Sequence, residues 1–282
     1  MDRVLVLTAA GSLPDAALAR AEAAGGRLLR RLAPDAAELG GEVESAAAAL
    51  AGLAVDANIL PAAGRRKRLL VADMDSTIIG VECIDEIAAE AGVGAQVAAI
   101  TERAMQGALD FEAALRERVA LLAGLPEAAL DRVCATRVRL NPGARRLVQT
   151  MNALGAVTAL VSGGFTWFTE RVAAEAGFGV HRANTLIIEN GRLTGAVAAP
   201  ILGRAAKRET LEALAAEAGL SPRDAVAVGD GANDAEMLRA AGLGVAFRAK
   251  PTLRSVADAV IDHADLTAVL SLQGIAEEER RG

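Results

Sequence analysis

The sequence predicts an α/β protein: a Rossmann-like parallel sheet with a helical insertion, preceded by a small N-terminal α+β unit. After residue 68, short and wholly apolar runs alternate with helical segments, which is typical of a parallel sheet covered on both faces. Residues 80–138 are helical in character and interrupt that alternation. The first 60 residues follow a different pattern, so we predict two domains, over residues 1–63 and 64–282.

Composition limits the classes of function. The chain has 282 residues, is 52% hydrophobic and carries a net charge of −6, so it can fold without disulfides and is a poor candidate for binding nucleic acid. No apolar stretch reaches the roughly 18 residues of a membrane span, and the N-terminus lacks the basic start of a signal peptide. We therefore expect a cytoplasmic protein whose thiols, Cys83 and Cys134, are reduced.

The N-terminal unit is predicted to have the order β-α-β-β-α-β of a ferredoxin-like module. Its elements are expected, in order, at Val4–Thr8, Asp15–Ala24, two strands within Arg27–Glu44, Ser45–Leu53 and Asp56–Leu60. Residues 61–68, PAAGRRKR, are interpreted as a solvated linker. Regulation or subunit contact is our hypothesis for this unit, and the residues do not distinguish a monomer from a homodimer.

The parallel sheet is predicted from five apolar runs. Its strands are expected at Leu69–Ala72, Ala156–Val161, Ala225–Val228, Leu243–Phe247 and Ala259–Ile261. The helices between them are expected at Ala144–Leu154, Trp167–Ala176, Lys207–Ala218 and Ala232–Ala241. A β-hairpin is expected at 184–197, because Asn190-Gly191 between two apolar runs favours a type I′ turn. Ligands bind at the carboxyl ends of such strands, so the site is expected there.

Two pairs of carboxylates follow the first and third of these strands. Asp73 and Asp75 are two residues apart and point the same way from a strand end, although a surface turn would give the same pattern. Asp230 and Asp234 lie in GDGAND, which alone could be a glycine-rich turn. Together, four carboxylates at one sheet edge form an oxygen-rich site that favours Mg²⁺ over zinc or copper.

An anion site is predicted beside these carboxylates. Ser162-Gly163-Gly164 follows the second strand and would open a helix, offering a hydroxyl and free N–H groups, though a plain helix cap fits as well. Lys207 would open the next helix. Its alternative is an ordinary surface lysine, but near the carboxylates it could balance charge and hold a phosphate.

Four motifs in this order resemble the haloacid dehalogenase (HAD) superfamily of aspartyl-phosphate phosphatases: DMDST (73–77), SGG (162–164), Lys207 and GDGAND (229–234). More narrowly, DMDSTIIGVECIDEIA, MQGALDFEAALRERV, LVSGGF and the Asn-Gly hairpin resemble the phosphoserine phosphatase family. The resemblance covers residues 68–272, and the first 60 residues do not share it. It implies a HAD-like phosphatase domain with its cap at about 80–138.

The resemblance also implies a role for each motif residue. Asp73 would be the nucleophile that forms an aspartyl-phosphate, and Asp75 the general acid and then the general base. Mg²⁺ would be held by Asp73, the backbone carbonyl of Asp75 and Asp230, with Asp234 supporting the site. The phosphoryl oxygens and the substrate would be bound by Ser162, Gly163, Lys207 and Asn233.

The helical insertion carries residues that could recognise a substrate. Phe111, Leu115 and Arg118 are spaced to share one helix face, and an arginine on an apolar face either snorkels or binds an anion. The resemblance favours the anion: Arg118 would bind the carboxylate of the substrate and Glu82 its ammonium group. Met105 and Phe111 would exclude water.

The function that the resemblance implies is Mg²⁺-dependent hydrolysis of O-phospho-L-serine, the last step of serine biosynthesis. One alternative is a HAD phosphatase or phosphotransferase for another small phosphate ester, although phosphoglycolate has no ammonium group for Glu82. The other is a phospho-accepting signalling module. That class needs neither a cap nor an acid–base group two residues after the acceptor, and this sequence has both.

Overall fold

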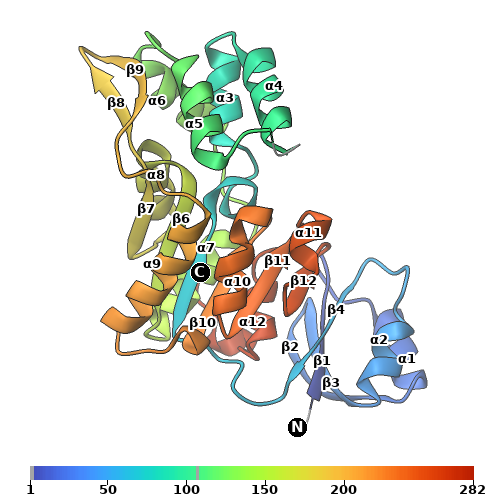
Figure 1. Cartoon of the computed structure of the whole chain (residues 1–282). Helices are drawn as coiled ribbons and strands as arrows, with labels where there is room; N and C mark the ends of the chain where they lie inside the picture. Colours follow the sequence, from blue (N-terminus) through green and yellow to red (C-terminus); the bar gives the residue numbers. More distant parts are fainter. Residues whose placement is uncertain (1–2, 106–107) are drawn as a thin grey trace.

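The computed structural model describes residues 3–105 and 108–282, apart from the side chain of Met105 (Figure 1). Its centre is a six-stranded parallel sheet of order β12-β11-β10-β5-β6-β7. The strands are β5 (Leu69–Ala72), β6 (Val157–Phe165), β7 (Val180–Asn184), β10 (Ala225–Gly229), β11 (Leu243–Phe247) and β12 (Ala259–Ile261). The predicted fold class is confirmed: an α/β core with a parallel sheet, a helical insertion and an extra antiparallel unit.

Alternate residues of the sheet are buried under two helical layers, as the apolar runs require. Leu70, Ala72 and Val228 face the layer formed by α7 (Ala144–Ala153), α8 (Thr166–Ala176) and α12 (Ala268–Leu272). Leu69 and Val71 face the layer formed by α9 (Arg204–Glu217), α10 (Ala235–Ala240) and α11 (Pro251–Arg254). Each buried leucine or valine contributes about 1.5–3 kcal/mol, so both layers fix β5 firmly at the centre.

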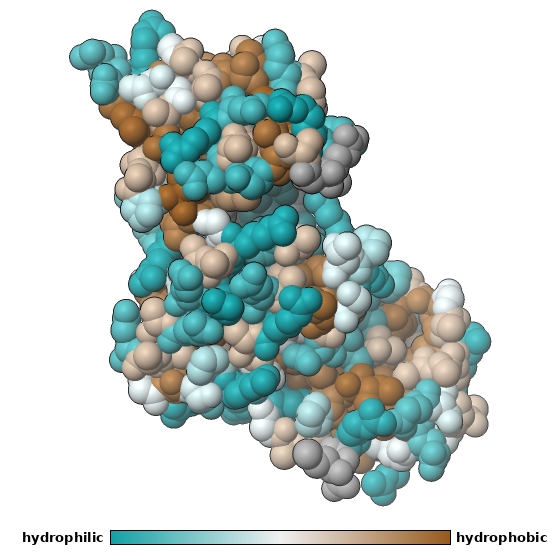
Figure 2. Space-filling model, viewed as in Figure 1, coloured by the Kyte–Doolittle hydropathy of each residue, from teal (hydrophilic) through white to brown (hydrophobic). Residues whose placement is uncertain are grey.

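The cap is a group of four helices between β5 and α7: α3 (Cys83–Glu90), α4 (Gly94–Met105), α5 (Phe111–Ala120) and α6 (Glu127–Thr136). It stands above the core, and the surface is hollowed between the two (Figures 1 and 2). Its two linkers meet in a bridge between Ile79 and Leu140, and Asn141 Nδ2 donates to the carbonyl of Thr77 at 2.7 Å. The chain therefore leaves and re-enters the core beside the turn that follows β5.

A hairpin joins the cap from another part of the chain. It consists of β8 (Leu186–Glu189) and β9 (Arg192–Val197), and Asn190 and Gly191 both have positive φ, as a type I′ turn requires. Backbone hydrogen bonds connect it to the segment between α5 and α6: the N–H of Gly124 donates to Leu193, that of Leu193 to Leu125, and that of Glu127 to Gly191, at 2.8–3.0 Å. Figure 1 shows the hairpin beside α5 and α6 rather than on the core sheet.

The N-terminal unit is a four-stranded antiparallel sheet of order β2-β3-β1-β4. Its elements are β1 (Arg3–Thr8), α1 (Asp15–Ala23), β2 (Gly26–Ala33), β3 (Ala36–Gly41), α2 (Val43–Ala48) and β4 (Asp56–Pro61). Strand β4 lies against the edge strand β12, where Asn58 exchanges two hydrogen bonds with the backbone of Val260 at 2.8–2.9 Å. Asp56 accepts the N–H groups of the residues that follow β12, so side chains connect the two sheet edges.

Several predicted boundaries are wrong. Ser162-Gly163-Gly164 does not open a helix: these residues continue β6 in extended form, and α8 begins at Thr166. Helix α9 begins at Arg204, so Lys207 lies one turn inside it. The predicted helix 232–241 is a 3₁₀ turn followed by α10, and α2 covers 43–48 instead of 45–53. Strand β7 was not predicted, because an edge strand need not be apolar on both faces.

Within residues 3–105 and 108–282, no helix is both long enough and apolar enough to pass through a lipid bilayer.

Candidate active site

The site lies where β5 and β10 end side by side, next to β6, which continues to Phe165. Ala72 of β5 pairs with Val228 of β10 on one side and with Leu160 of β6 on the other. Asp73 continues β5, and its N–H donates to the carbonyl of Val228 at 3.0 Å. The residues that follow β5 and β10 therefore converge beside the last residues of β6, because parallel strands deliver their carboxyl ends to one edge.

A tight turn follows β5. Oδ1 of Asp73 accepts the N–H of Met74 at 2.8 Å, and Ser76 adopts a positive φ of 54°. A non-glycine residue at positive φ is uncommon and is strained unless its surroundings hold it. Here Ser76 Oγ donates to Glu82 Oε1 at 2.7 Å, which ties the turn to the first residues of the cap.

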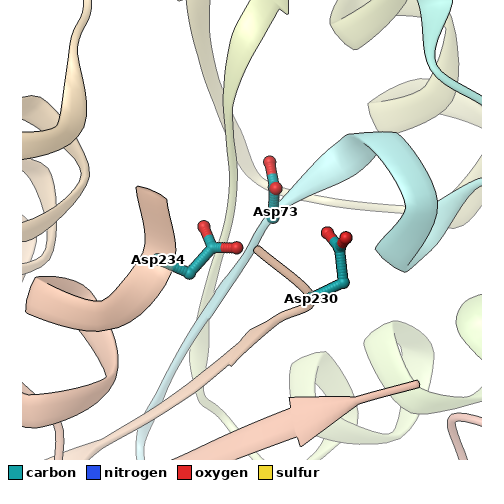
Figure 3. Close-up of side chains that lie close together, drawn as sticks. All are labelled: Asp73, Asp230 and Asp234. Carbon is teal, nitrogen blue, oxygen red and sulfur yellow. The ribbon is translucent and has the colours of Figure 1, made fainter. Parts of the chain in front are cut away.

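Three carboxylates are brought together at this edge, as Figure 3 shows. Asp73, Asp230 and Asp234 are all buried, and each offers an oxygen within 4.8 Å of the others. Lys207, 3% exposed, places Nζ 2.7 Å from Asp73 Oδ1 and 2.6 Å from Asp234 Oδ1. The predicted pairing of the two acidic motifs with the lysine is therefore present in the structure.

The charges in this cluster do not balance. Burial raises the pKa of Asp73 well above its usual range, and the neighbouring charge of Asp234 raises it further. Burial likewise raises the pKa of Asp230 to about 6. Burial alone would lower the pKa of Lys207, but Asp234 and Asp73 outweigh it and raise that pKa. Three carboxylates thus share one ammonium group, which leaves room for a divalent cation.

Asp234 is already occupied by protein partners. Its Oδ1 accepts from Lys207 and its Oδ2 accepts the N–H of Gly231 at 3.0 Å. Among the side chains that the structure describes, Thr77 alone donates to Asp230 Oδ1, from Oγ1 at 3.2 Å. Asp73 and Asp230 are thus better placed to bind a metal directly, while Asp234 orients Lys207 and the GDGAND turn.

Asp75 lies apart from the carboxylate cluster, which corrects the expectation of a four-carboxylate centre. Its Oδ1 accepts the N–H of Cys83 at 3.0 Å, and its Oδ2 accepts from Ser162 Oγ at 3.2 Å. Burial and the charge of Glu82 raise the pKa of Asp75 to about 6. A carboxyl group with such a pKa can both give and take a proton near neutral pH.

The Ser162-Gly163-Gly164 segment needs its glycines because neighbouring groups approach it closely. A Cβ at Gly164 would lie 2.7 Å from Asp75 Oδ2, and one at Gly163 would lie 3.1 Å from Cζ of Phe111 in the cap. Ser162 Oγ accepts the N–H of Gly164 at 2.8 Å while it donates to Asp75. This hydroxyl therefore connects the end of β6 to Asp75, the predicted acid–base group.

The cap carries the predicted Arg118, which lies close enough to Glu82 to be affected by its charge. Arg118 is half-buried, with Nε donating to the carbonyl of Ala114 at 3.2 Å and Nη1 to Thr101 Oγ1 at 3.5 Å. Burial lowers the pKa of Arg118, and the charges of Asp85 and Glu82 act in the opposite direction. Phe111 is half-buried over Gly163, whereas the side chain of Met105 lies outside the described residues.

Two residues of this region were not predicted. Thr77 is fully buried and holds Asp230, and its only sequence signal was its place in DMDST. Asn184 ends β7, is 1% exposed and bonds to the backbone of Gly163; a single asparagine gave no signal. Asn233, which the resemblance suggested for substrate binding, is half-buried in the 3₁₀ turn beside Gly231.

Comparison with known proteins agrees with this geometry. Residues 70–239 match the model of the haloacid dehalogenase-like hydrolase family. A phosphoserine phosphatase of Polaromonas sp. is 48% identical over 73% of this chain and 89% of its own length. The chain belongs to the phosphoserine phosphatase family. Another phosphoserine phosphatase, from Archaeoglobus fulgidus, is 47% identical over 77% of this chain.

The family relationship extends to the solved structures, but not to the full length of every relative. A probable phosphoserine phosphatase from Vibrio cholerae, in unliganded form, has a TM-score of 0.84 at 36% identity, covering 99% of this chain and 88% of that one. The chain spans 53–63% of the length of the curated phosphoserine phosphatases from Archaeoglobus fulgidus, Streptomyces coelicolor and Mycobacterium tuberculosis.

Proposed function

We propose that the protein hydrolyses O-phospho-L-serine to L-serine and phosphate in a Mg²⁺-dependent reaction through an aspartyl-phosphate, the last step of serine biosynthesis. The observation that carries the proposal is the juxtaposition of two differently held carboxyl groups. Asp73 contacts Lys207, as a nucleophile facing an anion requires, and Asp75 has a pKa of about 6 and its own partners. The names and coverage of the relatives support the same substrate.

The donor set of the carboxylate cluster fits Mg²⁺. All its donors are oxygens, and two of its three carboxylates, Asp73 and Asp230, keep capacity for a hard cation. We propose that these two, with the backbone carbonyl of Asp75, hold the ion, and that Asp234 supports them. When bound, Mg²⁺ would neutralise charge on the cluster and on the phosphoryl group.

In the first step, Asp73 forms a bond to phosphorus while the bond from phosphorus to the serine oxygen breaks. Oδ1 of Asp73 already faces Met74 N–H and Lys207, so we assign the attack to Oδ2. The proton of Asp75 passes to the leaving serine oxygen. Lys207, Ser162 and Gly163 would hold the phosphoryl oxygens, with Lys207 as their fixed positive charge.

In the second step, water attacks phosphorus and Asp73 leaves as a free carboxylate. Asp75, now ionised, takes the proton from that water and returns to its starting state. The hydrogen bonds from Cys83 N–H and Ser162 Oγ stabilise the ionised form of Asp75, and burial stabilises the neutral form. This balance suits a group that alternates between the two.

The substrate-recognition part of the proposal rests on the cap. Arg118 would bind the serine carboxylate and Glu82 its ammonium group, with Met105 and Phe111 excluding water and Asn233 contributing on the core side. The direct test is phosphate release from L-phosphoserine, D-phosphoserine, phosphothreonine, phosphoglycolate and p-nitrophenyl phosphate, with Mg²⁺ and with chelator. We expect chelator-sensitive preference for L-phosphoserine. A stable phosphoprotein with no turnover would favour a signalling module instead.

Replacement of Arg118 by alanine separates recognition of serine from chemistry. We expect Arg118→Ala to lower kcat/KM for L-phosphoserine roughly 10–100-fold, the loss typical of a hydrogen bond to a charged group. Turnover of p-nitrophenyl phosphate, which has no carboxylate beside its ester, is expected to stay within about 3-fold of the wild-type value. Arg116→Ala is the matched control, since Arg116 is exposed on α5 and, among the described residues, forms its ion pair with Glu112. Unchanged phosphoserine turnover in Arg118→Ala would remove this assignment.

We further propose a division into domains at residues 1–63 and 64–282, with the cap at about 80–138 and the hairpin at about 184–197. A separate apolar core between α1, α2 and the N-terminal sheet supports the first domain. A regulatory role for that domain, a homodimer and a cytoplasmic location belong to the proposal; the two free cysteines are consistent with that location.

A further inference from the structure

One buried amide joins two backbone segments of the site. Nδ2 of Asn184 donates to the carbonyl oxygens of Gly163 at 2.9 Å and Leu202 at 3.4 Å, and its Oδ1 accepts the N–H of Leu202 at 2.7 Å. These partners fix the orientation of the amide. If it were flipped, its NH₂ group would face an N–H donor and its oxygen would face two carbonyls.

The two segments lead to groups that the proposed function assigns to the phosphate. Gly163 follows Ser162 in β6, and Leu202 lies just before α9, whose first turns carry Lys207. The cap touches the same pair from above. A Cβ at Gly163 would lie 3.1 Å from Cζ of Phe111, and one at Gly203 would lie 3.8 Å from its Cδ1. Phe111 therefore rests on the two segments that Asn184 joins below.

The second segment lies outside the regular secondary structure, and the N–H of its first residue, Ala198, donates to the carbonyl of Thr185 at 2.9 Å. The chain leaves the core at Asn184, forms the hairpin beside the cap and returns at residues 198–203, which belong to no helix or strand. Burying an amide costs more than burying an apolar side chain of similar size, unless each polar atom finds a partner. Here every partner is backbone of these two segments, so the amide specifies their separation.

We propose that Asn184 is a positioning residue that sets the distance between Gly163 and the start of α9, so that Ser162, Gly163 and Lys207 meet one phosphoryl group. The inference rests on the proposed function and deepens it. Asn184 does not touch the substrate; it acts through the backbone of the groups that do.

The test is Asn184→Asp, which keeps the size of the side chain but replaces the donor facing two carbonyls by an acceptor. With Mg²⁺ present, we expect KM for L-phosphoserine, KM for p-nitrophenyl phosphate and the Kd of inorganic phosphate to rise together by about tenfold or more, because a buried hydrogen bond is lost. We expect kcat of Asn184→Asp to change less than KM and Kd do. A purely structural role would instead lower kcat through a smaller folded fraction and leave KM and Kd unchanged.

Asn58→Asp is the matched control. Asn58 of β4 also bonds to backbone through both amide atoms, in this case to the N–H and carbonyl of Val260. Val260 belongs to the edge strand β12, three strands from β5. We expect a lower melting temperature with wild-type KM and phosphate Kd. If both variants give the same KM and Kd, the positioning role of Asn184 is overturned.

A second variant covers the case in which Asn184→Asp does not fold. Asn184→Ser removes both amide atoms without introducing a charge, so its phosphate Kd is also expected to rise; a wild-type Kd would overturn the inference. Phosphate Kd is measured by titration calorimetry and needs no turnover. If wild type does not hydrolyse phosphoserine, the proposed function fails while the comparison of Kd values still decides the role of Asn184.

Discussion

Asp73→Asn is expected to abolish turnover, lowering kcat by roughly 10⁴-fold or more, as removal of a nucleophile does in other covalent catalysts. The amide keeps the shape of the carboxylate but cannot form the aspartyl-phosphate. The measurement is single-turnover and steady-state phosphate release with Mg²⁺. Asp15→Asn, at a side chain that is 96% exposed, is the control and should match wild type.

The same variant has a second, opposite effect. Asp73 is one of three buried carboxylates around a single ammonium group, and burial holds its pKa well above the usual range. Removing that charge should therefore raise the melting temperature of the metal-free protein, by about 2–4 °C for each kcal/mol gained. Near-normal turnover in Asp73→Asn would contradict the nucleophile assignment, and a lower melting temperature would contradict the charge argument.

Lys207→Met is expected to have the largest effect on stability. Lys207 is buried and contacts both Asp73 and Asp234, so its loss leaves three buried carboxylates without a cation. Breaking a buried ion pair in this way costs about 3–5 kcal/mol. Denaturant unfolding in chelator measures the loss, and added Mg²⁺ should restore part of it. Arg208→Met, at the next residue, removes only exposed ion pairs and should stay within about 0.5 kcal/mol.

The loss of unfolding free energy in Lys207→Met should become smaller as the pH falls. In wild type, burial raises the pKa of Asp230 to about 6, and the charge of Lys207 acts to lower it. Loss of Lys207 should therefore raise this pKa further, so the added cost of the charged carboxylate is present above the pKa of the variant and disappears as the pH falls to about 6. The free energy of unfolding of the metal-free variant should therefore approach that of wild type on acidification; a deficit that grows in that range would contradict the argument.

The centre of the fold could be predicted because its signals are local. Buried parallel strands such as β5 and β10 are apolar along their whole length, and the polar residues that end them are easy to recognise. The meeting of Asp73 with Asp230 follows from strand order alone. Element ends were harder: Ser162-Gly163-Gly164 has the composition of a helix start, but pairing between β6 and β7 resumes at Phe165 and keeps the segment extended.

The residues that the sequence did not predict depend on distant partners. Thr77 binds Asp230, 153 residues away, and Asn184 binds a loop that returns only after the hairpin. Neither spacing is periodic, so no window of sequence contains the signal. The resemblance to a family supplied roles for Glu82 and Arg118 that geometry leaves as predictions, since both belong to the cap and their partner is the substrate.

The hairpin changes what kind of lid the cap is. A lid joined to the core by one pair of adjacent linkers, here near Ile79 and Leu140, could rotate about that single hinge. Three backbone hydrogen bonds to β9 and its turn add a separate attachment, and the hairpin returns to the core just before Lys207. The cap thus has a third attachment to the core, through the hairpin, whose return segment leads to Lys207 of the proposed phosphate site. If the cap tilts, either the backbone hydrogen bonds between the cap and the hairpin break, or residues 198–203, which lead to Lys207, move with it.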